Sequence, residues 1–104
     1  MVADADLQVW LDTQPGAHQT VMIPYVKSAR DMRINYRIEL VQQSGGSTSR
    51  INQQGKVFAI AAQPTPIGSY AVGWQQGGEC RIELVLHNDA GSGDLGSYRF
   101  DCPR

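Results

Sequence analysis

Hydrophobic and polar residues alternate with a period of two along most of the chain, which is the pattern of strands that bury one face. The clearest run is residues 33–40, where apolar residues at even positions alternate with charged or polar residues at odd positions. Further strand-like runs lie at residues 7–12, 17–27, 68–74, 80–88 and 95–102, and a polar strand from about Thr48 to Gln53 continues past Gly55 through Val57, Phe58 and Ile60. No run has the period of a helix. The alternation therefore predicts an all-β protein with about seven strands.

Turn-forming residues separate these runs at regular intervals. The separators are Gln14-Pro15-Gly16, Ser28–Asp31, Ser44-Gly45-Gly46-Ser47, Pro64-Thr65-Pro66, Gly77-Gly78 and Asp89–Asp94. Short strands with evenly spaced turns favour an immunoglobulin-like (fibronectin III-like) seven-strand antiparallel β-sandwich, with a small barrel as the alternative. We expect residues 7–104 to form this single domain and residues 1–6 to be a disordered tail.

Pro24 interrupts the second run. A proline has no backbone N–H, so it cannot donate to the hydrogen-bond ladder of a sheet. We expect this strand to be kinked, bulged or at a sheet edge at that residue.

The last hairpin has a register that can be tested within the sequence. If its loop is centred on Gly91, antiparallel partners lie at equal distances from that residue. Opposite charges then face each other on one side and apolar residues on the other, which is the favourable arrangement. The pairs are Arg81–Asp101, Glu83–Arg99, Ile82–Phe100 and Leu84–Tyr98. A slip of one residue would destroy these matches.

The same register places Cys80, one of only two cysteines, opposite Cys102. We predict a disulfide that closes a loop of roughly 20 residues and stabilises the fold by about 3 kcal/mol. Such a bridge implies an oxidising compartment, the periplasm or the cell surface. Two buried free thiols are the alternative. The start of the chain lacks a signal-peptide pattern, so we expect either a mature exported domain behind an added initiator Met or a cytosolic protein.

Composition excludes several function classes. The 104 residues carry 9 Lys plus Arg against 10 Asp plus Glu, a net charge of -1 that argues against nucleic-acid binding. No run of apolar residues is long enough to span a membrane. Phosphate, dinucleotide and calcium motifs are absent, and two cysteines cannot form the usual zinc site. We expect no enzyme, metal or cofactor, with His18 and His87 on solvated strand faces. A serine nucleophile assembled only in space is the enzymatic alternative.

What remains is a charged surface. In an immunoglobulin-like sandwich the run 33–40 and the last hairpin lie side by side in one sheet, so their outward arginines share a face with carboxylates. We predict that this face binds a protein client, because the planar guanidinium suits carboxylates and amides. The alternative is a merely solvated, charge-laddered face. The predicted client-binding residues are Arg33, Arg37, Arg81 and Arg99, with Lys27 and Arg30 on the turn that leads into the sheet.

Several features in order resemble the small periplasmic curli-assembly family of CsgC and CsgH, nearer to the CsgH type. They are Tyr36-Arg37-Ile38-Glu39-Leu40, Gly45-Gly46-Ser47, a Gln-rich polar strand, the break at Pro64 and a final hairpin. The similarity covers about residues 7–102. It implies a seven-strand immunoglobulin-like sandwich in the periplasm that prevents premature amyloid formation by curli subunits. We expect a monomer that acts by transient, charge-assisted binding. Nucleic acid and membranes are not expected partners.

One departure from this family concerns redox chemistry. The CsgC type carries a Cys-x-Cys pair just before the arginine of its third strand. The matching positions here are Ile34, Asn35 and Tyr36, so a redox role tied to that pair is not available. Only Arg37 carries over, as part of the positive patch.

A different class of function stays open beside the amyloid inhibitor. The protein is alternatively a structural or adhesion immunoglobulin-like module that binds protein or carbohydrate. Exposed aromatic residues would favour carbohydrate, and Trp10 and Trp74 are the candidates.

Overall fold

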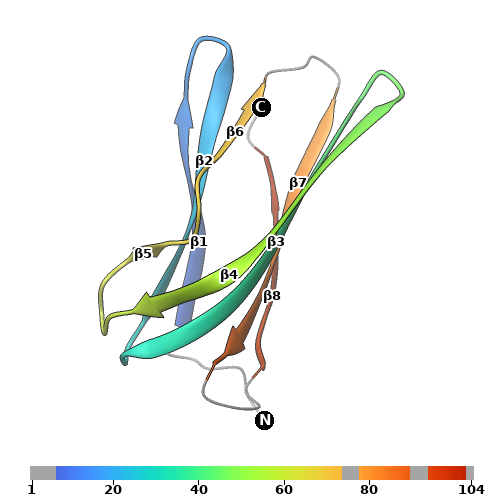
Figure 1. Cartoon of the computed structure of the whole chain (residues 1–104). Coiled ribbons are helices and arrows are strands. Elements are labelled where there is room, and N and C mark those ends of the chain that lie inside the picture. The colour runs from blue at the N-terminus through green and yellow to red at the C-terminus, as the bar shows by residue number, and fades with distance from the viewer. Residues whose placement is uncertain (1–6, 74–77, 90–93, 103–104) are drawn as a thin grey trace.

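The computed structural model describes residues 7–73, 78–89 and 94–102. These residues form two antiparallel sheets that face each other as the two layers of a β-sandwich, with no helix among them (Figure 1). The predicted tail 1–6 lies outside the described residues. The strands are β1 (Leu7–Pro15), β2 (Gln19–Ser28), β3 (Met32–Ser44), β4 (Ser47–Ala59), β5 (Thr65–Pro66), β6 (Tyr70–Gly73), β7 (Glu79–Asn88) and β8 (Asp94–Asp101).

The strand count is one higher than predicted because Thr65 and Pro66 form the two-residue β5, where the sequence indicates only a break. The first sheet, here called the β2 sheet, has β2 at its centre with β1 on one flank and β5 and β6 on the other. The second, here called the β3 sheet, has the order β4-β3-β7-β8. The strands of the predicted charged face, β3, β7 and β8, are therefore neighbours.

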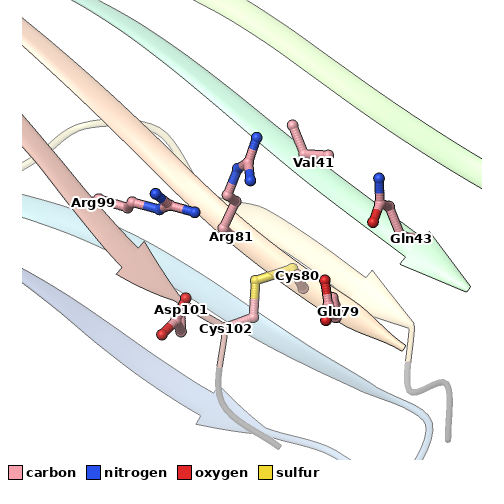
Figure 2. A pocket seen from close by; sticks show the side chains of 8 residues that line it. All are labelled: Val41, Gln43, Glu79, Cys80, Arg81, Arg99, Asp101 and Cys102. Carbon is pink, nitrogen blue, oxygen red and sulfur yellow. A yellow bond between two sulfur atoms is a disulfide. The ribbon is translucent and has the colours of Figure 1, made fainter. Parts of the chain in front are cut away.

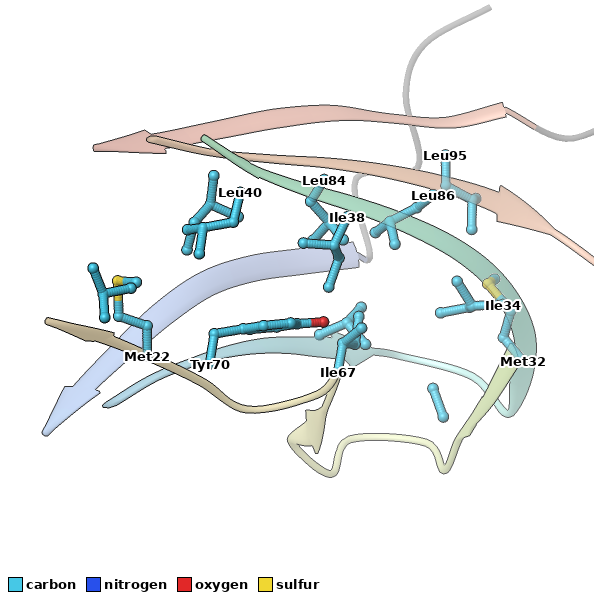
Figure 3. Packing of buried hydrophobic residues seen from close by; sticks show 14 residues of the cluster. Met22, Met32, Ile34, Ile38, Leu40, Ile67, Tyr70, Leu84, Leu86 and Leu95 are labelled. Carbon is cyan, nitrogen blue, oxygen red and sulfur yellow. The ribbon is translucent and has the colours of Figure 1, made fainter. Parts of the chain in front are cut away.

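The core fills the space between the sheets. Alternate residues of β2, β3 and β7 point inward and pack against one another. Ile67 and Tyr70, from the segment that leads into β6, complete this core (Figure 3). This is the inward-facing half of the period-two pattern, so the alternation in the sequence and the burial agree. The largest fully buried side chains are Met22, Pro24, Val26, Ser28, Ile34, Ile38, Ile67, Ile82, Leu84 and Leu86.

Pro24 does not lie in an edge strand. It is opposite Leu11 of β1, in the central strand of its sheet. On the other flank its carbonyl accepts a hydrogen bond from the N–H of Ile67 (N to O, 2.7 Å). Because the N–H and C=O of a strand residue point to the same side, the missing donor faces the place where β5 gives way to β6. The proline is accommodated by this change of partner strand.

The two hairpins of the β3 sheet differ in their turns. Gly45 and Gly46 have φ of 55° and 84°, and Ser44 pairs with Ser47, so a tight two-residue turn joins β3 to β4. In the other hairpin the predicted register is confirmed from Arg81–Asp101 to Leu86–Gly96. A bulge between Leu86 and His87 then shifts the pairing by one residue. The loop centre, residues 90–93, lies outside the described residues.

A disulfide and a side-chain hydrogen bond connect further parts of the sandwich. Cys80 and Cys102 form the predicted disulfide, and the N–H of Cys102 donates to the carbonyl of Cys80 (3.0 Å). The buried Tyr70 hydroxyl of β6 donates to Gln53 Oε1 of β4 (3.0 Å). Burial, and secondarily the nearby Tyr36, raise the pKa of Tyr70 to about 12. Tyr70 is therefore neutral and a hydrogen-bond donor at physiological pH.

Candidate binding face

The outer face of the β3 sheet brings together the four arginines predicted for it. Arg33 and Arg37 lie on β3, Arg81 on β7 and Arg99 on β8, all at positions whose neighbours in sequence point into the core. The pairing places Arg37 opposite Val85 and Arg99 opposite Glu83. The predicted face is therefore one continuous surface across three strands.

β4 adds two cations that sequence reasoning missed. Arg50 lies opposite Val41 and Lys56 opposite Asn35, so both share the outer face. The tight Gly45-Gly46 turn fixes this register, just as a loop centred on Gly91 predicts that of the last hairpin, so the signal was present in the sequence. It was obscured because residues 47–54 are polar on both sides of the strand and show no inward-facing half.

The face has a mild positive bias although the chain has a net charge of -1. Among the side chains that the structure describes, its strands carry six cations and four carboxylates. The cations are Arg33, Arg37, Arg50, Lys56, Arg81 and Arg99, and the carboxylates are Glu39, Glu79, Glu83 and Asp101.

Three of these cations are already paired. Arg50 lies 3.8 Å from Glu39 (Nη1 to Oε1), and Lys56 lies 3.5 Å from Asp89 (Nζ to Oδ1). Arg81 Nε lies 3.6 Å from Oε1 of Glu83. That last pair runs along β7 and not across to the cross-strand partners that the register predicts.

Arg33, Arg37 and Arg99 have no carboxylate oxygen within 4.0 Å among the described residues. All three are exposed. Exposed guanidinium groups without an internal partner keep their full set of donors for another molecule. They are the part of the face with the greatest capacity to bind.

A hollow of about 430 Å³ opens on this face beside the disulfide (Figure 2). Arg81 and Arg99 line it from two adjacent strands, and Gln43 adds an amide. Nε of Arg81 is buried and makes no hydrogen bond with any described group. Two guanidinium groups and an amide can together bind a carboxylate or a backbone carbonyl of another molecule. Val41, Glu79, Cys80, Asp101 and Cys102 complete the lining.

Arg30 lies where it was predicted, on the turn between β2 and β3, beside Arg33 in a second hollow of about 610 Å³. The same hollow includes Phe58, a residue that is 51% exposed. Lys27 was placed wrongly. It lies within β2, opposite Gln8, on the outer face of the other sheet, because β2 continues to Ser28 and Val26 and Ser28 take the inward positions.

The remaining candidates are dispersed. Trp10 stacks on Tyr25 across β1 and β2 (ring centroids 5.6 Å apart, planes at 10°) and is half-buried on the outer face of the β2 sheet. Trp74 lies outside the described residues. His18 is exposed in the turn between β1 and β2, and His87 is exposed on β7. The described ranges contain no cluster of three or more potential metal ligands and no helix that could cross a membrane.

The fold and the face together define a small two-sheet β-sandwich with a cation-rich sheet surface. Two of the solved structures that share this fold are curli-related proteins. The E. coli curli protein CsgC is similar with a TM-score of 0.77 and 17% identity, over 90% of this chain and 97% of that one. R. palustris CsgH is similar with a TM-score of 0.66 and 18% identity, over 89% of this chain and 87% of that one.

These similarities confirm that the chain has the fold of the curli-related proteins that the sequence resembles. The TM-score is higher for CsgC while the identities are nearly equal, so a placement nearer the CsgH type stays a prediction. No protein-family model matches the sequence, and no curated protein has a matching sequence. At the positions compared with the Cys-x-Cys pair, Ile34 is fully buried and Tyr36 is half-buried on the inner side of β3.

Proposed function

We propose that this protein is a periplasmic, chaperone-like inhibitor that binds amyloidogenic curli subunits through the outer face of the β3 sheet. One observation carries the proposal: Arg33, Arg37 and Arg99 lie without an ion-pair partner among the described residues, on an open face of a fold shared with CsgC and CsgH. The protein acts as a monomer and by binding, not by catalysis. The Cys80–Cys102 disulfide supports an oxidising compartment.

The chemistry of the face suits a weak and transient contact. Curli subunits are expected to form Gln- and Asn-rich strands that template one another at their edges. Guanidinium groups bind the amide oxygens, backbone carbonyls and carboxylates of such a chain. Each exposed contact contributes less than about 1 kcal/mol, so several are needed and the client leaves readily. An inhibitor that intercepts nuclei acts below one-to-one stoichiometry, because each nucleus would otherwise consume many subunits.

The test is a fibrillisation assay of a curli subunit with substoichiometric protein. We expect the parent protein to lengthen the lag time. The double variant Arg33→Glu/Arg37→Glu keeps the buried Ile34 and Ile38 in place, so it should fold and lose most of this delay. Added salt should weaken the parent in the same direction, because exposed charges are screened within about 10 Å at 0.1 M.

A charge-matched control separates this face from net charge alone. Lys27→Glu changes the net charge as much as Arg37→Glu does, but on the other sheet. We expect Lys27→Glu to inhibit like the parent and Arg37→Glu to inhibit less. An unchanged lag time with the parent protein at all ratios would overturn the proposed function. Equal inhibition by the folded double variant, with no effect of salt, would overturn the charged-face mechanism.

A further inference from the structure

β4 is a long edge strand. It pairs with β3 over 13 residues without a register shift, from Ser47 opposite Ser44 to Ala59 opposite Met32. In the described part of the chain no other strand pairs with β4. Figure 1 shows the tip of the β3–β4 hairpin standing clear of the other sheet. The edges at β1 and β8 are shorter, with nine and eight residues.

The turn decides which backbone groups of β4 are free. A two-residue hairpin of this kind begins with a hydrogen-bonded pair, here Ser44 and Ser47. In an antiparallel ladder hydrogen-bonded and non-hydrogen-bonded pairs alternate, so the odd residues of β4 bond to β3. The N–H and C=O groups of the even residues point away from the sheet. These residues are Thr48, Arg50, Asn52, Gln54, Lys56 and Phe58.

The middle of this edge lacks the usual protection. Natural edges are guarded by proline, bulges, charged side chains or a covering segment, and on β4 the charges lie at Arg50 and Lys56 only. Residues 47–59 contain no proline, and their pairing is uninterrupted. Between Arg50 and Lys56 the sequence is the uncharged Ile-Asn-Gln-Gln-Gly, and residues 47–54 are exposed on both faces. An edge that is long, regular and open can accept another strand.

We propose that the β4 edge binds an extended Gln- and Asn-rich strand, which adds to the β3 sheet beside β4. This inference rests on the proposed function, because the added strand belongs to the amyloid-forming client. Asn52 and Gln54 present amide side chains on the outer face, and amides of neighbouring strands form hydrogen-bonded ladders. On the inner face Gln53 keeps its amide donors, because its Oε1 already accepts from Tyr70. Ile51, which is 37% exposed, can pack against an apolar residue of the added strand.

The charges on β4 disfavour a second copy of this chain as the occupant. If two β4 strands paired in antiparallel fashion about Gln53, Arg50 of each would lie opposite Lys56 of the other. Like charges directly opposite each other destabilise a strand pair. The same two cations favour an occupant that is uncharged or acidic. The charged face thus attracts a client strand and the β4 edge binds it, while the like charges on β4 keep two copies of the inhibitor from pairing through the same edge.

Hydrogen exchange gives a direct test. The probe is a soluble synthetic peptide of roughly eight alternating Gln or Asn and Val residues, an ordinary strand length. On addition of the peptide we expect new amide protection at Arg50, Asn52 and Gln54. The amides of Ile51 and Gln53 are bonded to β3 beforehand and should change little. Uniform protection along β4, or none, would overturn strand addition.

A matched pair of variants tests the same point by affinity. Asn52→Pro removes one outward N–H, which an edge strand tolerates because that N–H is not part of the internal ladder. Asn52→Ala removes the amide side chain but keeps the N–H. We expect the proline variant to bind the peptide about tenfold more weakly than the alanine variant, the effect of losing one hydrogen bond. Equal binding by the two folded variants would overturn the proposal.

Further measurements keep the two proposals separable. If Asn52→Pro does not fold, Gln54→Pro removes the next outward N–H and takes its place, with Gln54→Ala as its control. Alternating protection with no effect of the parent on curli fibrils would support the edge and overturn the proposed function. Loss of fibril inhibition in Arg33→Glu/Arg37→Glu but not in Asn52→Pro would leave the charged face intact and overturn the edge.

Discussion

The two hairpins of the β3 sheet form its two edges and are built in contrasting ways. The β3–β4 hairpin is long, has a regular register and ends in a tight Gly45-Gly46 turn. The β7–β8 hairpin is shorter, contains a bulge after Leu86 and is closed at its far end by the Cys80–Cys102 disulfide. One edge strand is covalently tied to its neighbour. The other has no covalent tie: it is held by pairing with β3, the Tyr70–Gln53 hydrogen bond, the Lys56–Asp89 ion pair and the packing of Val57 and Ala59 on the core.

The difference shows that a single sheet can combine a protected edge and an accessible one. A bulge increases local twist and terminates regular pairing, so it makes β8 a poor template for another strand. β4 has none of these features along its uncharged middle. Because both edges border the same charged face, the cations can attract a client while only one edge accepts it.

The largest expected effect comes from removing the cross-link that distinguishes the two hairpins. Cys80→Ala/Cys102→Ala should lower the free energy of unfolding by about 3 kcal/mol, because the cysteines are 22 residues apart and the open loop regains its entropy in the unfolded chain. Denaturant unfolding measures this loss. Reduction of the parent protein should reproduce it, and a loss below about 1 kcal/mol would contradict the entropic role of the bridge.

The next effect concerns the turn of the β3–β4 hairpin. Gly46→Ala should cost about 1–2 kcal/mol, because φ of 84° is unfavourable for a residue with a Cβ. Gly73→Ala is the control: an added Cβ meets nothing within 4 Å at either position, but Gly73 does not have a positive φ. Thermal unfolding of the two variants separates backbone strain from crowding. Equal stabilities of the two variants would show that the positive φ of Gly46 does not cause a loss of stability when alanine replaces it.

A smaller effect is expected at the Tyr70–Gln53 link. Tyr70→Phe removes one hydrogen bond and should cost about 1 kcal/mol near neutral pH. The pKa of Tyr70 rises from 10.0 to about 12 on folding, so the folded state holds this proton more tightly. The parent protein should therefore keep its full stability below pH 10 and lose part of it as the pH rises towards 12.

The difference in the free energy of unfolding between the parent and Tyr70→Phe isolates the titration of Tyr70, because all other groups titrate alike in the two proteins. We expect the stability advantage of the parent to shrink between pH 10 and 12, as followed by denaturant unfolding at each pH. A constant difference across this range would show that Tyr70 ionises as readily in the folded protein as in the unfolded chain.

The smallest effect is expected for the ion pair between Arg50 and Glu39. Arg50→Gln should change the free energy of unfolding by less than about 0.5 kcal/mol, because the atoms are 3.8 Å apart and more than half of the arginine side chain is exposed. Denaturant unfolding at low and high salt measures it. A much larger loss would mean that β4 depends on this pair for its position.

The hairpin β7–β8 shows how far sequence reasoning can reach. Its register is overdetermined, because a slip of one residue would turn Ile82 and Leu84 outward and separate the cysteines. The charged face followed from the same alternation, since residues two apart in a strand share a side. The register of Arg50 and Lys56 was also implied by the Gly45-Gly46 turn, although a strand that is polar on both sides does not show which face looks outward.

Other features were decided only by the tertiary structure. Alternation divides the residues of a strand into two faces, but it does not say which sheet the strand joins. The sequence therefore predicted the wrong sheet for Lys27. The change of partner strand that accommodates Pro24 is also not encoded in any local pattern. The open edge of β4 likewise exists because the chain after Ala59 crosses to the other sheet and forms β5 there. These outcomes depend on contacts between segments distant in sequence, whereas the register of each hairpin depends on its own turn and its own residues.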